Sequence, residues 1–173
     1  DYLAPGYTHF NKRILYVTHD VTPLLKQGKN AMATVLGNAW YNIQSKAVWN
    51  FETAEWRNRP RMLCELRLTY TDGSVETIYT DENWLTTTGP YTYNNQWNGD
   101  MYDARHEQEG WKTEIFDDSQ GKKVALTESP APLIVAQQMP GIRIVEELKP
   151  VSLKKFNDRL YGYSYAKNIS GLT

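Results

Sequence analysis

The chain has 173 residues, of which 40% are apolar and 23% are charged, and a net charge of −1 at pH 7. These values are typical of one globular domain, and they exclude the basic excess that a nucleic-acid-binding surface needs. No run of about 18 apolar residues is present, so the sequence predicts no membrane-spanning helix. Cys64 is the only cysteine, which excludes an internal disulfide and a thiolate metal site.

The N-terminal part of the chain predicts two strands separated by a turn. Residues 12–22 alternate between two faces, which is the period of a strand. One face carries Leu15, Val17 and Val21. Residues 22–30 contain proline and glycine, which favour a turn or a single helical turn. Residues 31–41 predict the second strand, in which Gly37 indicates a bulge or the close approach of another segment.

Residues 43–60 form the longest irregular stretch, and they include three large aromatic residues, Trp49, Phe51 and Trp56. Such rings carry a large apolar area, so we expect the stretch to pack against the rest of the chain. Two arrangements fit the sequence: the tryptophans form a platform for a sugar ring, or they cover one end of a β-sandwich.

The strongest local signal is a β-hairpin. Residues 62–70 and 75–79 alternate in polarity, and Asp72-Gly73 between them is a two-residue turn signal. Further strands are predicted in residues 133–138, 141–153 and 159–168. Many short strands separated by Asn, Asp and Gly turns predict an all-β fold, an antiparallel β-sandwich that forms one domain over residues 1–173.

Residues 93–111 (YNNQWNGDMYDARHEQEGW) concentrate amide, aromatic and carboxylate side chains. One interpretation is a binding loop, in which amides contact vicinal hydroxyls and rings contact the face of a sugar. The candidate substrate-binding residues here are Asn94, Asn95, Trp97, Asn98 and Tyr102. Asp100 and Asp103 would supply oxygen ligands to a hard cation such as calcium. The alternative is structural: Asn and Asp fix turns, Asp103 pairs with Arg105 across a strand, and the rings pack.

We expect no catalytic residue in this chain. His9, His19 and His106 lie far apart in the sequence, without the spacing of zinc ligands. The adjacent Asp117 and Asp118 predict a turn or a helix cap, because neighbouring side chains point in different directions and cannot form the acid–base pair of a glycosidase.

Four segments stand out when the whole chain is taken in order. They are LAPGYTHFNKRILYVTHDVTPLLKQGKNAMATVLGNAWY, YTDGSVETIYTDENW, GPYTYNNQWNGDMYDAR with GW and FDDS behind it, and VAQQMPGIRIVEELKP. From Leu3 to the C-terminus, this ordered set resembles the N-terminal module of bacterial α-L-rhamnosidases.

The resemblance implies a jelly-roll-like β-sandwich of the galactose-binding type, without the first strands that precede the APG segment in other members. It implies a non-catalytic accessory or substrate-recognition module. Its partners would be a rhamnose-containing carbohydrate and the other domains of the parent enzyme, with no nucleic acid and no membrane. The parent would be an inverting glycoside hydrolase, periplasmic or secreted, that hydrolyses terminal α-L-rhamnosides in a separate barrel domain.

The resemblance also implies an alternative, because some members bind L-rhamnose through a calcium ion. Under this alternative the chain is an autonomous calcium-dependent carbohydrate-binding module. Asn11, in HFNKR, lies where relatives hold calcium and sugar, and it is a candidate ligand for both. Lys12 departs from such a site, because a cation beside calcium is electrostatically unfavourable. The structural alternative is a strand entry with exposed polar groups.

Overall fold

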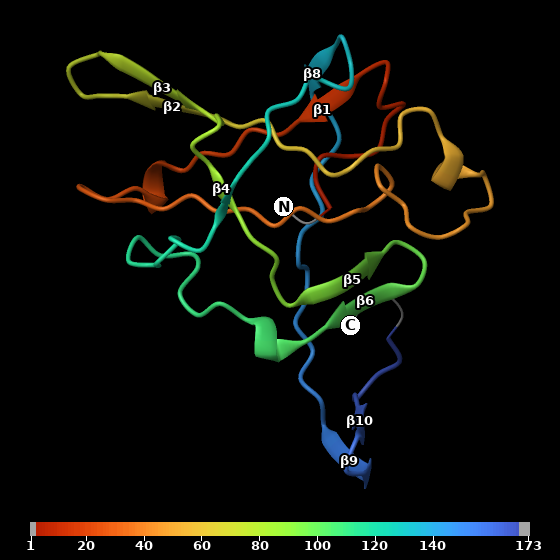
Figure 1. Ribbon diagram of the computed structural model, residues 1–173. Coiled ribbons are helices and arrows are strands. Elements are labelled where there is room, and N and C mark those ends of the chain that lie inside the picture. Colours follow the sequence, from red (N-terminus) through yellow and green to blue (C-terminus); the bar gives the residue numbers. More distant parts are fainter. Residues whose placement is uncertain (1–2, 170–173) are drawn as a thin grey trace. The chain divides into compact units, whose positions relative to one another are not determined.

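The computed structural model of the protein describes residues 3–169. In this range it has ten short strands and three single-turn 3₁₀ helices, so the predicted all-β class is confirmed. No described helix is long and apolar enough to cross a membrane. In chain order the elements in Figure 1 are β1 (Ile14–Tyr16), η1 (Thr22–Leu24), η2 (Phe51–Thr53), β2 (Glu65–Thr69), β3 (Val75–Tyr79), β4 (Leu85–Thr86), β5 (Tyr91–Asn95), β6 (Gly99–Tyr102), η3 (Ala104–His106), β7 (Lys122–Lys123), β8 (Ile134–Ala136), β9 (Ser152–Asn157) and β10 (Leu160–Ser164).

Within residues 3–169 the strands pair as five two-stranded ladders. Four ladders are antiparallel, as predicted: β2–β3, β4–β7, β5–β6 and β9–β10. The ladder of β1 with β8 is parallel, and it joins segments that lie far apart in the sequence. A parallel pair requires a long crossover connection, and the local pattern of either strand does not reveal its partner.

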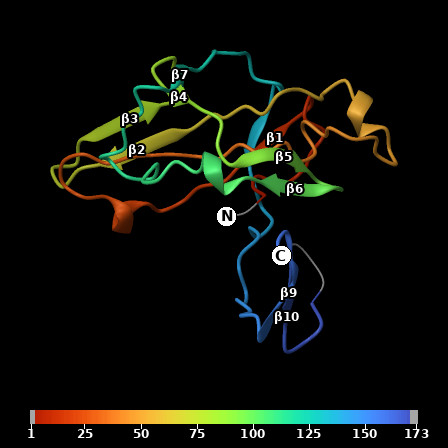
Figure 2. The ribbon, with the colours of Figure 1, turned by 60° about the horizontal axis from the view of Figure 1, so that its bottom comes forward.

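The β2–β3 hairpin, visible in Figures 1 and 2, confirms the strongest local prediction, since all five residues of each strand are paired. The predicted two-residue turn is wrong, because the loop between the strands runs from Tyr70 to Ser74. The Tyr70 N–H donates a hydrogen bond to the Ser74 carbonyl at 2.9 Å and closes this loop. Gly73 adopts a φ of +86°, which glycine tolerates without a steric penalty. The Asp72 carboxylate accepts hydrogen bonds from the Ser74 N–H and hydroxyl. Both residues of the turn signal therefore stabilise a longer loop.

Two predicted strand regions are wrong in the described chain. Residues 31–41 form no ladder, because the Asn38 N–H donates instead to the Asn94 side-chain oxygen at 2.8 Å. A Cβ on Gly37 would lie 3.3 Å from that same oxygen, so the predicted close approach is confirmed. Residues 143–150 are exposed coil, and the C-terminal hairpin begins only at β9. Alternation predicts a strand, but a strand forms only where a partner satisfies its backbone groups.

The best-buried part of the chain is an aromatic cluster around η2. Ile43 is fully buried and Trp56 is 8% exposed. The Trp56 ring packs edge-on against Phe10 and Phe51, with centroid distances of 5.1 and 5.6 Å, a favoured geometry for aromatic pairs. Trp49 contacts Phe51 but is 64% exposed. The predicted packing is confirmed for Phe51 and Trp56, and it supports a covering role rather than a sugar platform.

The described chain divides into two compact units. Residues 5–140 hold β1 to β8 and the aromatic cluster. Residues 3–4 and 141–169 form the other unit, built on the β9–β10 hairpin, in which Lys167 and Glu146 pair at 2.6 Å. The expectation of a single domain over residues 1–173 stays a prediction.

The chain exposes far more surface than folded units of its size. Its accessible surface is 14797 Å², whereas two independent globular units of these sizes would expose about 10,000 Å². In the described range the buried apolar residues are Ile43, Ala47, Trp56 and Ala131. Most apolar side chains therefore lie at the surface.

Candidate functional site

The β5–β6 hairpin gathers six of the residues predicted to bind sugar or metal. They are Asn94, Asn95, Trp97, Asn98, Asp100 and Tyr102. Cross-strand pairing places Asn94 opposite Asp100 and Asn95 opposite Gly99. A ligand can use only the polar atoms that the fold leaves free, so the hydrogen bonds within the hairpin decide what it can do.

Asn95 is 3% exposed and is occupied by the fold. Its Oδ1 accepts hydrogen bonds from the N–H groups of Trp97 and Asn98, at 2.8 and 3.1 Å, which fixes the turn. Its Nδ2 donates to the Ser45 hydroxyl at 3.1 Å, which ties the hairpin to the loop before η2. An asparagine that bonds the backbone ahead of it is a turn device, and this side chain has little left for a sugar.

Asn94 is occupied in the same way. Its Oδ1 accepts from the Asn38 N–H, and its carbonyl accepts from Asn38 Nδ2 at 2.9 Å. Its Nδ2 donates to Asp100 Oδ1 at 2.5 Å. Three contacts therefore link Asn94 to the segment before Trp40 and to the opposite strand. Sequence reasoning missed Asn38 and Ser45, whose role depends on contacts between distant segments.

The remaining residues of the hairpin are half-exposed. The Trp97 ring is 51% exposed and packs edge-on against Trp40 at 5.4 Å. Asn98 Nδ2 donates to the Tyr93 hydroxyl at 3.3 Å. The Tyr102 hydroxyl donates to the Glu107 carboxylate, and this hydrogen bond raises the pKa of Tyr102 to about 12. Of the two candidate rings of the hairpin, Trp97 is therefore the one that is half-exposed and not tied to a carboxylate.

Asp103 is the N-cap of η3 and is held by Arg105. Its carboxylate accepts from the Arg105 N–H at 3.0 Å and from the guanidinium Nε and Nη2 at 2.8 and 2.5 Å. These hydrogen bonds lower the pKa of Asp103 to about 2. The predicted pairing with Arg105 is confirmed, but it lies within the helix cap and not across a strand.

The predicted metal ligands are not gathered into one cluster. Asn11 lies in a separate exposed turn, where its Oδ1 is 2.5 Å from His9 Nδ1. Among residues 3–169, no hydrogen bond links Asn11 to Asp100 or Asp103, and no group of three His, Cys, Asp or Glu side chains could hold a metal. Calcium takes roughly six to eight oxygen ligands, and both carboxylates already bind neighbours. These residues as placed do not fit a calcium site, and calcium stays a prediction.

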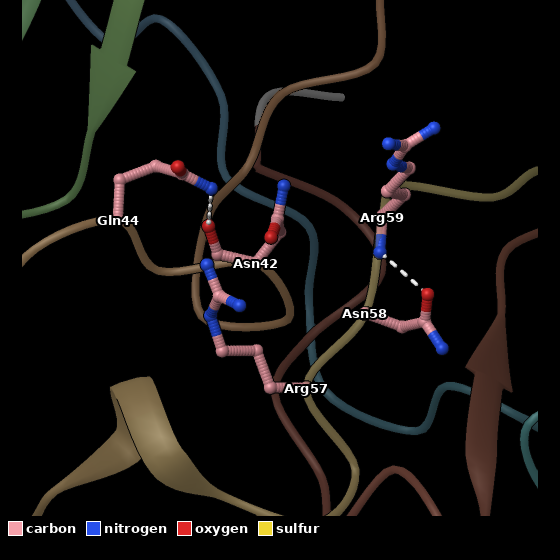
Figure 3. Close-up of a pocket in the computed structure, with 5 residues that line it drawn as sticks. All are labelled: Asn42, Gln44, Arg57, Asn58 and Arg59. Atoms are coloured by element: carbon pink, nitrogen blue, oxygen red, sulfur yellow. Dashed lines mark hydrogen bonds between the residues drawn. The ribbon is translucent and has the colours of Figure 1, made fainter.

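A polar pocket that the sequence analysis missed lies between the segments on either side of η2. Its volume is about 420 Å³, and Figure 3 shows the side chains that line it. We call it the Arg57 pocket, and its lining residues are Asn42, Gln44, Arg57, Asn58 and Arg59. The Asn58 N–H donates to the Tyr41 carbonyl at 3.1 Å, which holds the two segments together. The sequence signal for this pocket is the Arg-Asn-Arg triplet after Trp56. From the sequence, the aromatic residues of this stretch were considered instead.

The carboxylates with shifted pKa values do not resemble catalytic acids. Where the pKa of a described carboxylate is shifted, it is lowered, and hydrogen bonds from neighbouring groups are the main cause. These carboxylates are Asp20, Glu52, Asp72, Asp103, Glu114 and Asp117. The Asp117 carboxylate accepts from the Ser119 N–H at 3.0 Å, as expected for a turn. A general acid at neutral pH requires a raised pKa.

Comparison with known sequences identifies relatives over nearly the whole chain. Residues 1–146 match the family of α-L-rhamnosidase N-terminal domains. The chain is 33% identical over 171 residues to an α-L-rhamnosidase of Formosa agariphila, and 35% identical over 172 residues to one of Streptomyces avermitilis. These matches cover 98% and 99% of this chain but 18% and 16% of the relatives.

Solved structures agree with the sequence comparison. The α-L-rhamnosidase from Dictyoglumus thermophilum matches with a TM-score of 0.76 and 35% identity, over 93% of this chain and 17% of that one. The α-L-rhamnosidase of Streptomyces avermitilis, complexed with L-rhamnose, matches with a TM-score of 0.72 and 30% identity, over 92% of this chain and 15% of that one. These matches are consistent with the predicted all-β sandwich. The chain spans less than a fifth of the length of these proteins.

Proposed function

The chain belongs to the family of α-L-rhamnosidase N-terminal domains, and from this premise we propose that it is a non-catalytic accessory domain of a bacterial α-L-rhamnosidase. It packs against the other domains of the parent enzyme and helps to present rhamnose-containing carbohydrate to a catalytic domain elsewhere in that protein. The parent hydrolyses terminal α-L-rhamnosides with inversion at the anomeric carbon. The observation that carries the proposal is the excess of exposed surface.

Exposed apolar side chains provide a strong driving force for docking. Val145 is 97% exposed, Ile115 is 85% exposed and Val48 is 82% exposed. Complete burial of a side chain of this size is worth about 1.5–3 kcal/mol. A few such residues are enough to hold a domain against a neighbour.

The occupant of this surface is the rest of the parent chain. The relatives extend well beyond the matched region, which is 13–19% of their length. The exposed apolar residues are spread over both compact units, with Val48 and Ile115 in one and Val145 in the other. A two-fold contact between copies uses one self-complementary patch, whereas a scattered distribution fits cover by several domains.

The hydrolytic step belongs to another domain. An inverting glycosidase uses two carboxyl groups roughly 6.5–9.5 Å apart, one of which must carry a proton near neutral pH. The shifted carboxylates of the described chain, such as Asp103 and Asp117, have lowered pKa values because neighbouring groups donate hydrogen bonds to them. This chain contributes to recognition instead, through the exposed face of the Trp97 ring.

Activity of the full-length protein and of the isolated 173-residue chain tests the non-catalytic role. The substrate is p-nitrophenyl α-L-rhamnopyranoside. We expect the full-length protein to release nitrophenol and the isolated chain to release none. Hydrolysis by the isolated chain would overturn the assignment.

Charge substitutions in the full-length protein test the docking role. Ile115→Asp should lower the unfolding temperature, because it places a charge in a contact that the other domains bury. Gln120→Asp adds the same charge at an exposed polar position nearby and should have little effect. Equal unfolding temperatures for the two variants would contradict docking at Ile115.

A further inference from the structure

The Arg57 pocket rests on the most deeply buried packing among the described residues. Ile43, which lies between Asn42 and Gln44, is fully buried, and Trp56, which precedes Arg57, is 8% exposed. The lining residues Asn42 and Gln44 are therefore the chain neighbours of one buried residue, and Arg57 is the neighbour of another. Such a base keeps the pocket in shape without a ligand, and a preorganised site loses less free energy on binding.

The Arg57 side chain is held at one end and open at the other. Its Nε donates to the Ile43 carbonyl at 2.8 Å. Within residues 3–169 its two terminal amino groups donate to no protein acceptor, and no carboxylate forms an ion pair with Arg57 or Arg59. Two parallel N–H groups on a fixed guanidinium match the two oxygens of a carboxylate or a sulfate.

The amides beside Arg57 supply acceptors (Figure 3). Asn42 Nδ2 donates to Asn38 Oδ1 at 2.7 Å, and Gln44 Nε2 donates to the Asn42 carbonyl at 2.8 Å. Their side-chain oxygens accept no hydrogen bond from the described residues. Both amide groups are thus oriented by their nitrogens, and their oxygens are free for the hydroxyl groups of a ligand.

We propose that the Arg57 pocket binds an anionic sugar residue. The carboxylate or sulfate group pairs with the Arg57 guanidinium, and sugar hydroxyls donate to the oxygens of Asn42 and Gln44. In Figure 3 the Arg59 side chain projects away from Arg57, so it adds positive charge at the rim without contacting the same group. No carboxylate lines the pocket, and a neutral sugar would leave the Arg57 charge uncompensated. The site stands apart from the docking role and from the hairpin, since none of the residues at those places lines it.

Ligand-observed saturation-transfer NMR on the full-length protein tests the site with three probes. They are methyl β-D-glucuronide, methyl β-D-glucoside and glucose 6-sulfate, which differ in charge and in the geometry of the anion. We expect at least one anionic probe to bind about tenfold more tightly than the neutral glucoside, because a charge-assisted pair is lost with the neutral ligand. Added sodium chloride should weaken the binding of the anionic probe, because salt screens the charge pair.

Substitutions then locate the binding. Arg57→Gln should weaken binding of the anionic probe about tenfold, because one bidentate pair with the guanidinium is lost. Arg67→Gln removes an equivalent charge from the exposed side of β2, outside the pocket, and should leave binding unchanged. Thermal unfolding of each variant establishes that it is folded.

Each outcome decides the proposal. Preference for the glucuronide identifies a carboxylate site, preference for the sulfate identifies a sulfate site, and either supports the inference. Equal binding of the charged and neutral probes, binding of none, or unchanged binding by folded Arg57→Gln overturns it. If Arg57→Gln unfolds because it loses the Ile43 contact, the selectivity of the unmodified protein among the three probes still decides.

Discussion

The β5–β6 hairpin and the Arg57 pocket are both polar, but they use their polar groups differently. In the hairpin, Asn94 and Asn95 are bonded to the backbone, to Asp100 and to Ser45. In the pocket, Arg57 makes one fixing contact and leaves two amino groups open. The hairpin holds the fold together, and the pocket is equipped for a ligand. Unused hydrogen-bonding capacity therefore marks a site better than the number of polar residues does.

Removing the aromatic base of the pocket should have the largest effect. Trp56→Ala leaves a cavity among Tyr7, Phe10 and Phe51, whose rings surround it. We expect the free energy of unfolding to fall by about 3–5 kcal/mol, measured by urea denaturation with circular dichroism. Trp49→Ala, at a ring that is 64% exposed, is the matched control and should cost less than about 1 kcal/mol. Similar losses for the two variants would show that the aromatic cluster is not the core.

Removing a hairpin amide should have the next largest effect. Asn95→Ala leaves the turn N–H groups and the Ser45 hydroxyl without a partner in a buried place, so we expect a loss of about 1–3 kcal/mol. Asn98→Ala is the control, because that side chain is exposed and its bond to the Tyr93 hydroxyl is 3.3 Å long. An Asn95 variant as stable as the Asn98 variant would mean that Asn95 is not structural.

The Asp103–Arg105 pair should give a smaller, pH-dependent effect. The folded-state pKa of Asp103, about 2, lies below its ordinary value of 3.8. The contribution to stability is therefore complete above the ordinary value, and it is lost as the pH falls from there toward 2. Asp103→Asn should flatten this part of the curve of unfolding free energy against pH. A curve unchanged by Asp103→Asn would contradict the pairing.

Removal of calcium should have the smallest effect of these changes, and we expect it not to alter the binding of L-rhamnose. The hairpin carboxylates already form hydrogen bonds within the protein. Calorimetric titration of L-rhamnose with calcium, and then with excess chelator, should give the same result in both conditions. Asp100→Asn provides the matched variant and should not change the outcome. Rhamnose binding that disappears with chelator would restore the calcium-dependent alternative and would require ligands other than the residues placed together here.

Local signals predicted local structure well. The alternation in residues 62–79 and the Asp72-Gly73 signal located β2 and β3, because a hairpin depends on neighbouring residues. The parallel β1–β8 ladder was not predictable, since the two strands lie near opposite ends of the sequence of residues 5–140. Asn38 is the clearest case of failure: its segment alternates like a strand, but its N–H is taken by a side chain from β5.

The same limit applied to the candidate site. The stretch from Tyr93 to Trp111 suggested ligands by residue type, but part of the contacts that occupy Asn94 and Asn95 come from Asn38 and Ser45, which lie far away in the sequence. The Arg57 pocket depends on two segments that meet only in the fold. The carboxylate pair of a hydrolase, by contrast, was not expected from the sequence, and its absence from this chain stays a prediction.

Hydrogen–deuterium exchange can determine whether the other domains of the parent enzyme cover this accessory domain. The 173-residue chain and the full-length protein are compared peptide by peptide around Val48, Ile115 and Val145, which are almost fully exposed in the chain alone. We expect markedly slower exchange at these places in the full-length protein, because neighbouring domains exclude water from them. Equal exchange in the two proteins would show that the surface stays open and would contradict the docking role.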